Sequence, residues 1–130
     1  MKSKLIILLS AVLLILLSSF LQDSKWTAPE AEAKKKNPIE STEKSLKTGM
    51  KLYGKICWSC HGVDGKGNGP AGASLNPKPA DFSMMEVQEQ TDGALYWKLS
   101  TGRGNMMGYG NSLEDDQRWA IVHYLRSLEK

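Results

Sequence analysis

The feature that most constrains this chain is the pentapeptide Cys57-Trp-Ser-Cys60-His61, which holds both cysteines and one of the two histidines in 130 residues. Two residues separate the cysteines, so a single helical turn would present both thiols and the following imidazole together. Four kinds of site use such a cluster: a disulfide, a zinc site, a dithiol redox centre and a haem attachment site. The rest of the sequence discriminates among them.

Three of these sites fit the chain poorly. A disulfide between Cys57 and Cys60 would close a very small ring and would stabilise the fold little. Zinc needs four ligands, and the other histidine, His123, stands alone inside a predicted helix. A thioredoxin-type dithiol follows a strand within a parallel sheet, and no strand is predicted here.

The pattern Cys-x-x-Cys-His is the c-type haem attachment sequence. The thiols of Cys57 and Cys60 add to the two vinyl groups on one edge of the porphyrin, and His61 then presents its imidazole to the iron. The motif therefore predicts one haem c, held covalently by the two cysteines, with His61 as an iron ligand.

The second axial ligand should be soft or an imidazole. Met106 and Met107 are the candidates, because they are adjacent in a glycine-rich, polar segment where core packing would explain them poorly. Met50, Met84 and Met85 are instead expected to pack in the core.

Residues 1–21 are predicted to be a signal peptide or an N-terminal membrane anchor. Lys2 and Lys4 precede an apolar run, as in secretory signals. As a helix, residues 5–21 would span about 26 Å, just short of a bilayer core of about 30 Å. Both interpretations leave the lysines in the cytoplasm and place the rest of the chain on the periplasmic side of the cytoplasmic membrane, anchored or secreted.

Residues 22–40 read as a flexible linker, rich in Ala, Glu, Lys and Pro and without apolar periodicity. Residues 41–130 then form the domain. They carry eleven basic and ten acidic side chains, a balance that offers nucleic acid no basic surface.

Helices are expected at 42–54 and 93–101, and a third is expected to follow a capping box formed by Ser112 and Asp115. A short helix is possible at 83–89. Between the first two long helices lies a segment of about 30 residues rich in glycine and proline, which is long for a compact domain unless it wraps around something. The fold class is therefore all-α, with three or four helices wrapped around one haem.

The sequence resembles the class I c-type cytochromes, in particular the bacterial monohaem domain, over about residues 45–128. "CWSCHG" resembles the attachment helix of that family, "GNGPA" and "LNPKPADF" resemble its proximal loop, and "GRGNMMGYG" resembles its axial methionine loop. In the family pattern Gly-x-Gly-x-Met-Pro, Met107 stands where proline is usual, so the resemblance assigns Met106 as the ligand.

The resemblance also implies contacts between elements. Gly49 and Tyr53 of the first helix should cross the last helix near Trp119 and Tyr124, and the carbonyl of Pro70 should accept the second ring proton of His61. Candidates for contact with the haem propionates are Trp97, Arg103 and Tyr109.

We therefore expect a one-electron carrier with His61 and Met106 on the iron, and no enzyme activity of its own. Its partners would be redox proteins of a membrane respiratory chain, with residues 5–21 giving membrane attachment. An alternative is a haem subunit that feeds electrons to a larger membrane or periplasmic enzyme. A less favoured alternative is a haem sensor in which a ligand displaces Met106.

Overall fold

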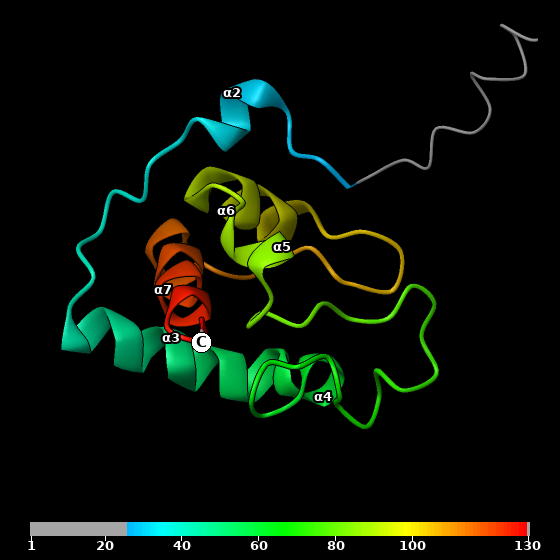
Figure 1. Ribbon diagram of the computed structural model, residues 1–130. Helices are drawn as coiled ribbons and strands as arrows, with labels where there is room; N and C mark the ends of the chain where they lie inside the picture. The colour runs from blue at the N-terminus through cyan, green and yellow to red at the C-terminus, as the bar shows by residue number, and fades with distance from the viewer. Residues whose placement is uncertain (1–25, 130) are drawn as a thin grey trace, which may run out of the picture.

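The computed structural model describes residues 26–129, in which helices are joined by long loops (Figure 1). No strand occurs in these residues, and one isolated bridge joins Arg103 to Met106. The helices are α2 (Glu30–Ala33), α3 (Glu43–Ile56), α4 (Trp58–His61), α5 (Met85–Gln88), α6 (Asp92–Thr101) and α7 (Asp115–Arg126). The all-α prediction is confirmed. None of these helices is long and apolar enough to cross a membrane, and the predicted signal or anchor at 1–21 lies outside the described residues.

Helices α3 and α7 cross at a glycine. A Cβ placed on Gly49 would lie 2.1 Å from the carbonyl oxygen of Ala120, so only glycine allows this approach. Beside the crossing, the rings of Tyr53 and Tyr124 lie 5.1 Å apart. The expected pairing with Tyr124 is present, whereas Trp119 stacks on Tyr96 of α6 at 3.9 Å.

The helix ends follow the sequence with one exception. Thr42 accepts a hydrogen bond from the backbone N–H of Ser45 and caps α3, and Gly102, with φ of +67°, ends α6. The exception is the start of α7, which we expected at Ser112. Ser112 instead belongs to a turn in which its N–H donates to the carbonyl of Tyr109 at 3.2 Å. Helix α7 therefore begins at Asp115, after a capping box formed by Glu114 and Gln117.

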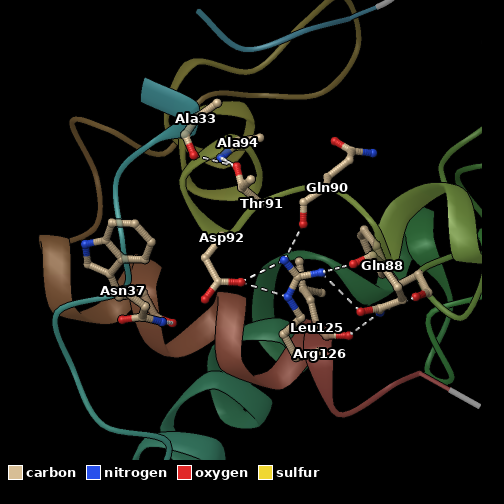
Figure 2. Close-up of polar contacts among 11 residues, drawn as sticks. Ala33, Asn37, Gln88, Gln90, Thr91, Asp92, Ala94, Leu125 and Arg126 are labelled. Carbon is tan, nitrogen blue, oxygen red and sulfur yellow. Dashed lines mark hydrogen bonds and ion pairs between the residues drawn. The ribbon is translucent and has the colours of Figure 1, made fainter. Parts of the chain in front are cut away.

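Arg126, at the end of α7, holds the segment between α5 and α6 (Figure 2). Its Nε donates to the carboxylate of Asp92 at 2.8 Å. Its two terminal nitrogens donate to the backbone carbonyls of Gln88 at 2.7 Å and Gln90 at 2.5 Å. The planar guanidinium thus supplies donors to two backbone carbonyls, at the end of α5 and just before α6, that helical hydrogen bonds do not use.

Residues 26–40 differ from the flexible linker that the sequence predicts, because they lie along α6 and α7; we call this segment the strap. Ala28 in it is buried, at 8% exposed. The carbonyl of Ala33 accepts a hydrogen bond from Thr91 at 2.6 Å, and the side chain of Asn37 donates to the carbonyl of Trp119 at 3.2 Å. Figure 1 shows α2 on the opposite side of the domain from α3 and α4.

Three methionines expected in the core lie at the surface. Met50, Met84 and Met85 are 53%, 55% and 71% exposed. The expectation was wrong for Met84 and Met85 because α5 is a single turn that buries only Val87, and Phe82 fills the adjoining core position. It was wrong for Met50 because α3 buries Gly49 and Tyr53 instead.

Candidate functional site

The two cysteines and His61 lie on one turn immediately after α3. Cys57 ends α3, where its N–H donates to the carbonyl of Tyr53 at 2.9 Å, and it also begins α4. The N–H of His61 donates back to the carbonyl of Cys57 at 2.9 Å. Cys57, Cys60 and His61 are all half-buried. The single turn that the spacing predicts is therefore present.

His61 is oriented by a backbone carbonyl. Its Nδ1 donates a hydrogen bond to the carbonyl of Ala80 at 3.1 Å, which leaves Nε2 with its lone pair. The imidazole also stacks on Phe82, with ring centroids 4.5 Å apart. Burial lowers the pKa of His61, partly offset by the Ala80 hydrogen bond. The ring is therefore held as a neutral donor ligand.

The acceptor for His61 is Ala80 and not Pro70, as we had expected. The chain around Pro70 is instead paired with the backbone of α4. The N–H of Gly69 donates to the carbonyl of Cys60 at 3.1 Å, and that of Ala71 donates to the carbonyl of Ser59 at 2.8 Å. This pairing occupies the proline-containing turn, so the later part of the same loop reaches the histidine.

Glycines in the long loop allow it to pack directly on α4. A Cβ on Gly69 would lie 2.4 Å from the carbonyl oxygen of Ser59, and one on Gly72 would lie 2.4 Å from that of Cys60. Below them, the buried hydroxyl of Tyr53 donates to the carbonyl of Gly62 at 2.6 Å. The long glycine- and proline-rich segment, which the composition predicted to wrap around something, thus packs around α4, the turn that carries Cys60 and His61.

The thiols are free, and the chemistry of Cys57 is that of a protonated thiol. Burial, and then the neighbouring Cys60, raise the pKa of Cys57 to about 12. Reactive dithiols have lowered pKa values. Within residues 26–129, no three side chains of His, Cys, Asp or Glu gather as a metal site would require. Neither a thioredoxin-type centre nor zinc fits this arrangement.

The methionine loop presents its two methionines differently. Met106 is half-buried and packs against the core, whereas Met107 is 67% exposed. The loop is a tight turn in which Arg103 and Met106 exchange backbone hydrogen bonds of 2.9 and 3.0 Å. Gly104, with φ of +57°, lies inside this turn.

Tyr109 ties the methionine loop to the attachment turn. Its N–H donates to the carbonyl of Leu99 at 2.9 Å, and its hydroxyl donates to the carbonyl of Ile56 at 3.2 Å. Ile56 directly precedes Cys57, so this bond brings the two halves of the candidate site together. Sequence reasoning named Tyr109 only as a propionate contact; its position three residues after Met106 was the available signal.

The remaining candidates have other neighbours. The guanidinium of Arg103 lies over the ring of Trp26, with 6.0 Å from its carbon to the ring centroid, and Trp97 also contacts Trp26. Nε2 of His123 donates to the carbonyl of Ile39 at 2.8 Å, on the strap side of α7.

The donor set fits a covalently held haem. Two thiols stand on one turn, the hydrogen bond to Ala80 orients a neutral imidazole whose Nε2 is free, and a thioether lies in a loop tied to the same turn. The partly buried side chains of Ile56, Met106 and Tyr109 add apolar surface, which suits a flat hydrophobic macrocycle.

Comparison with known proteins places these residues in context. The profile of the family described as Cytochrome c matches residues 46–129. The solved reducing HAO-like protein complex Kustc0457/Kustc0458 of Kuenenia stuttgartiensis is 31% identical, with a TM-score of 0.62 over 72% of this chain and 47% of that chain. The KustC0563 c-type cytochrome is 29% identical, with a TM-score of 0.54 over 63% of this chain and 98% of that chain. This chain thus spans about half the length of the first relative. The comparison with curated proteins gives no match.

Proposed function

The chain belongs to the cytochrome c family, whose domain transfers electrons through a c-type haem, and we propose that here the iron is held by His61 and Met106. The resemblance noted in the sequence is confirmed by this membership. The family and the motif imply a covalent haem on Cys57 and Cys60. The axial ligands, the location and the partners are our proposals.

The difference in burial between the two methionines supports the choice of Met106 as the axial ligand. Of the two adjacent methionines, Met106 packs against the core while Met107 is 67% exposed. The hydroxyl of Tyr109 ties the same loop to Ile56 at 3.2 Å. An axial ligand must face inward from a fixed loop, and Met106 meets both conditions.

This ligand set suits an electron carrier. The haem supplies a one-electron couple between ferric and ferrous iron, and a thioether ligand favours the ferrous form relative to a second histidine. The protein contributes a fixed imidazole at His61 and a fixed thioether at Met106. With both axial positions filled, no open site is left for a substrate.

The test is the visible spectrum of the matured wild-type protein beside Met106→Ala and Met107→Ala. Met106→Ala should abolish the methionine-to-iron charge-transfer band of the ferric protein, and Met107→Ala should retain it. Loss of the band only in Met107→Ala would overturn the ligand choice. An absent Soret band in wild type, after expression with a haem maturation system, would contradict haem attachment itself.

A second candidate function is that of a haem subunit within a larger redox assembly. It is favoured by the 31% identity to a chain of an HAO-like protein complex, of which this chain spans about half. A stable partner that co-purifies from the native membrane or periplasm would support this role. Purification as a single chain that exchanges electrons with soluble donors would support the free carrier.

Carbon monoxide binding distinguishes a haem sensor from an electron carrier. Rapid binding of carbon monoxide to the reduced protein would show that Met106 is readily displaced, and this would contradict a pure carrier. Slow or absent binding is expected when the methionine loop stays closed.

We also propose that the domain works outside the cytoplasmic membrane with partners of a membrane respiratory chain. The support is the charged start and apolar run of residues 1–21. Membrane fractionation together with the mass of the mature chain would separate an anchor from a cleaved signal. Recovery of the haem protein in the cytoplasm would contradict both.

A further inference from the structure

We propose that Trp26 is a positioning residue for the loop that carries Met106, and that the strap (residues 26–40) braces this loop against α6. The inference rests on the proposal that Met106 binds the iron. It also concerns a segment that lies before the matched family region, which begins at residue 46.

The strap is fixed to the start of α6. A Cβ on Gly93 would lie 2.2 Å from the carbonyl oxygen of Glu32, so the two backbones are in direct contact. Figure 2 shows the second link, in which the hydroxyl of Thr91 donates to the carbonyl of Ala33 at 2.6 Å. Thr91 also caps α6 through the N–H of Ala94. The strap therefore joins α6 at the cap of the helix.

The strap is also fixed to α7. The side chain of Asn37 donates to the carbonyl of Trp119 at 3.2 Å. The carbonyl of Ile39 accepts a hydrogen bond of 2.8 Å from His123. Because it is attached to both α6 and α7, the strap is an integral part of the domain.

Trp26 lies at the other end of the strap, beside the methionine loop. Its ring centroid is 6.4 Å from that of Trp97 and 5.3 Å from the ammonium of Lys98, both on α6. On its loop side, the guanidinium carbon of Arg103 is 6.0 Å from the same ring. Cations at these distances are attracted to the face of an indole.

Arg103 links the contact with Trp26 directly to Met106. The two residues exchange the backbone hydrogen bonds that close the turn, at 2.9 and 3.0 Å. Gly102 directly precedes the turn and Gly104 lies inside it, both with positive φ, and glycines leave such a segment with many alternative conformations. By holding Arg103, Trp26 disfavours the open conformations in which Met106 would leave the iron.

The test uses the full-length, haem-loaded protein and imidazole as the probe, because imidazole binds ferric iron only when the methionine leaves. Trp26→Ala should bind imidazole about two- to fivefold faster than wild type, the range expected when one exposed cation–ring contact is lost. Trp26→Phe, which keeps an aromatic face, should lie between them. Glu30→Ala is the matched control in the strap, because the exposed Glu30 forms an ion pair with the exposed Lys34 of the same segment, and it should leave the rate unchanged.

A second variant keeps the test informative even if Trp26→Ala prevents the strap from docking. Arg103→Gln removes the cation from the loop side and should accelerate imidazole binding to a similar extent. The double variant Trp26→Ala/Arg103→Gln should add little to either single change. Strictly additive effects would overturn the proposal.

The failure of this inference is distinguishable from failure of the proposed ligation. The wild-type charge-transfer band and its loss in Met106→Ala report the ligand alone. If that band behaves as expected while Trp26→Ala binds imidazole at the wild-type rate, the brace is wrong and the ligand assignment stands. A lowered melting temperature with an unchanged imidazole rate would likewise reduce Trp26 to a structural role and overturn the proposal.

Discussion

The hydroxyl of Tyr109 donates a hydrogen bond to the backbone carbonyl of Ile56 at 3.2 Å, and it thereby joins the methionine loop to the residue that precedes Cys57. The two contributors to the site are far apart in the sequence, and this bond spans them directly. The ring of Tyr109 is itself half-buried against the core. The relationship predicts that the loop and the attachment turn move together.

Tyr109→Phe should weaken this link while keeping the ring. Loss of one partly buried hydrogen bond should lower the free energy of unfolding by about 1 kcal/mol. In guanidinium titrations of the ferric protein, the methionine-to-iron band should disappear at a lower denaturant concentration than in wild type. Met107→Ala, which alters an exposed side chain of the same loop, is the control and should shift the midpoint little. Equal midpoints for Tyr109→Phe and wild type would contradict the coupling.

The Tyr53 hydroxyl makes stability sensitive to alkaline pH. Burial raises the pKa of Tyr53 above its ordinary value of 10.0, and the hydroxyl donates to Gly62 at 2.6 Å. The unfolded chain would therefore lose this proton at a lower pH than the folded protein. The stabilising contribution is complete below about pH 10 and is lost as the pH rises toward the folded pKa.

Tyr53→Phe removes that one titration. Its free energy of unfolding should be lower than that of wild type at neutral pH, and the difference should shrink above about pH 10. Denaturant unfolding at a series of pH values measures this. A difference that grows with pH would show that the assigned direction of the pKa shift is wrong.

Two glycines of α3 predict opposite effects of the same substitution. A Cβ on Gly49 would overlap the carbonyl of Ala120 at 2.1 Å, whereas one on Gly54 would meet nothing within 4 Å. Gly49→Ala should therefore force α3 and α7 apart and destabilise the fold by about 1–3 kcal/mol. Gly54→Ala should stabilise it by about 0.5–1 kcal/mol, because alanine favours the helix. Thermal unfolding of the pair checks the crossing, and a stable Gly49→Ala protein would refute it.

The sequence predicted what is local. Cys57, Cys60 and His61 are specified by their spacing, and a single turn of chain is enough to bring them together. The all-α class followed from helix periodicity and from a long glycine-rich segment without strand patterns. The helix expected at 93–101 ends where α6 ends, because Gly102 follows directly and glycine readily adopts the positive φ that ends a helix.

What depends on distant partners was missed. Trp26 lies in a polar, lysine-rich segment, and its partner Trp97 is far along the chain, so composition alone indicated a linker. The acceptor for His61 changed from Pro70 to Ala80, because backbone pairing with α4 decided which part of the loop reached the ring. The ligand role of Met106 stays a prediction, supported by the burial that distinguishes it from Met107.

Substitution of Arg126 tests most directly how α7 stabilises α5 and the start of α6. Arg126→Ala would remove the bonds to Asp92, Gln88 and Gln90 and leave partly buried carbonyls without a donor. Each lost bond to a charged group is worth about 1.5–3 kcal/mol alone, and such effects overlap within a network. We therefore expect a loss of about 2–4 kcal/mol in the free energy of unfolding.

Arg126→Lys is the informative companion, because an ammonium keeps the charge but lacks the planar fork that reaches three acceptors. It should recover less than half of the loss. Lys47→Ala, which breaks an exposed pair with Glu43 on α3, should change stability by no more than about 0.5 kcal/mol. Hydrogen exchange of the α5–α6 amides locates the effect: Arg126→Ala should accelerate exchange there and Lys47→Ala should not. Full recovery by lysine would show that the network acts through net charge alone, and the geometry of the fork would then be irrelevant.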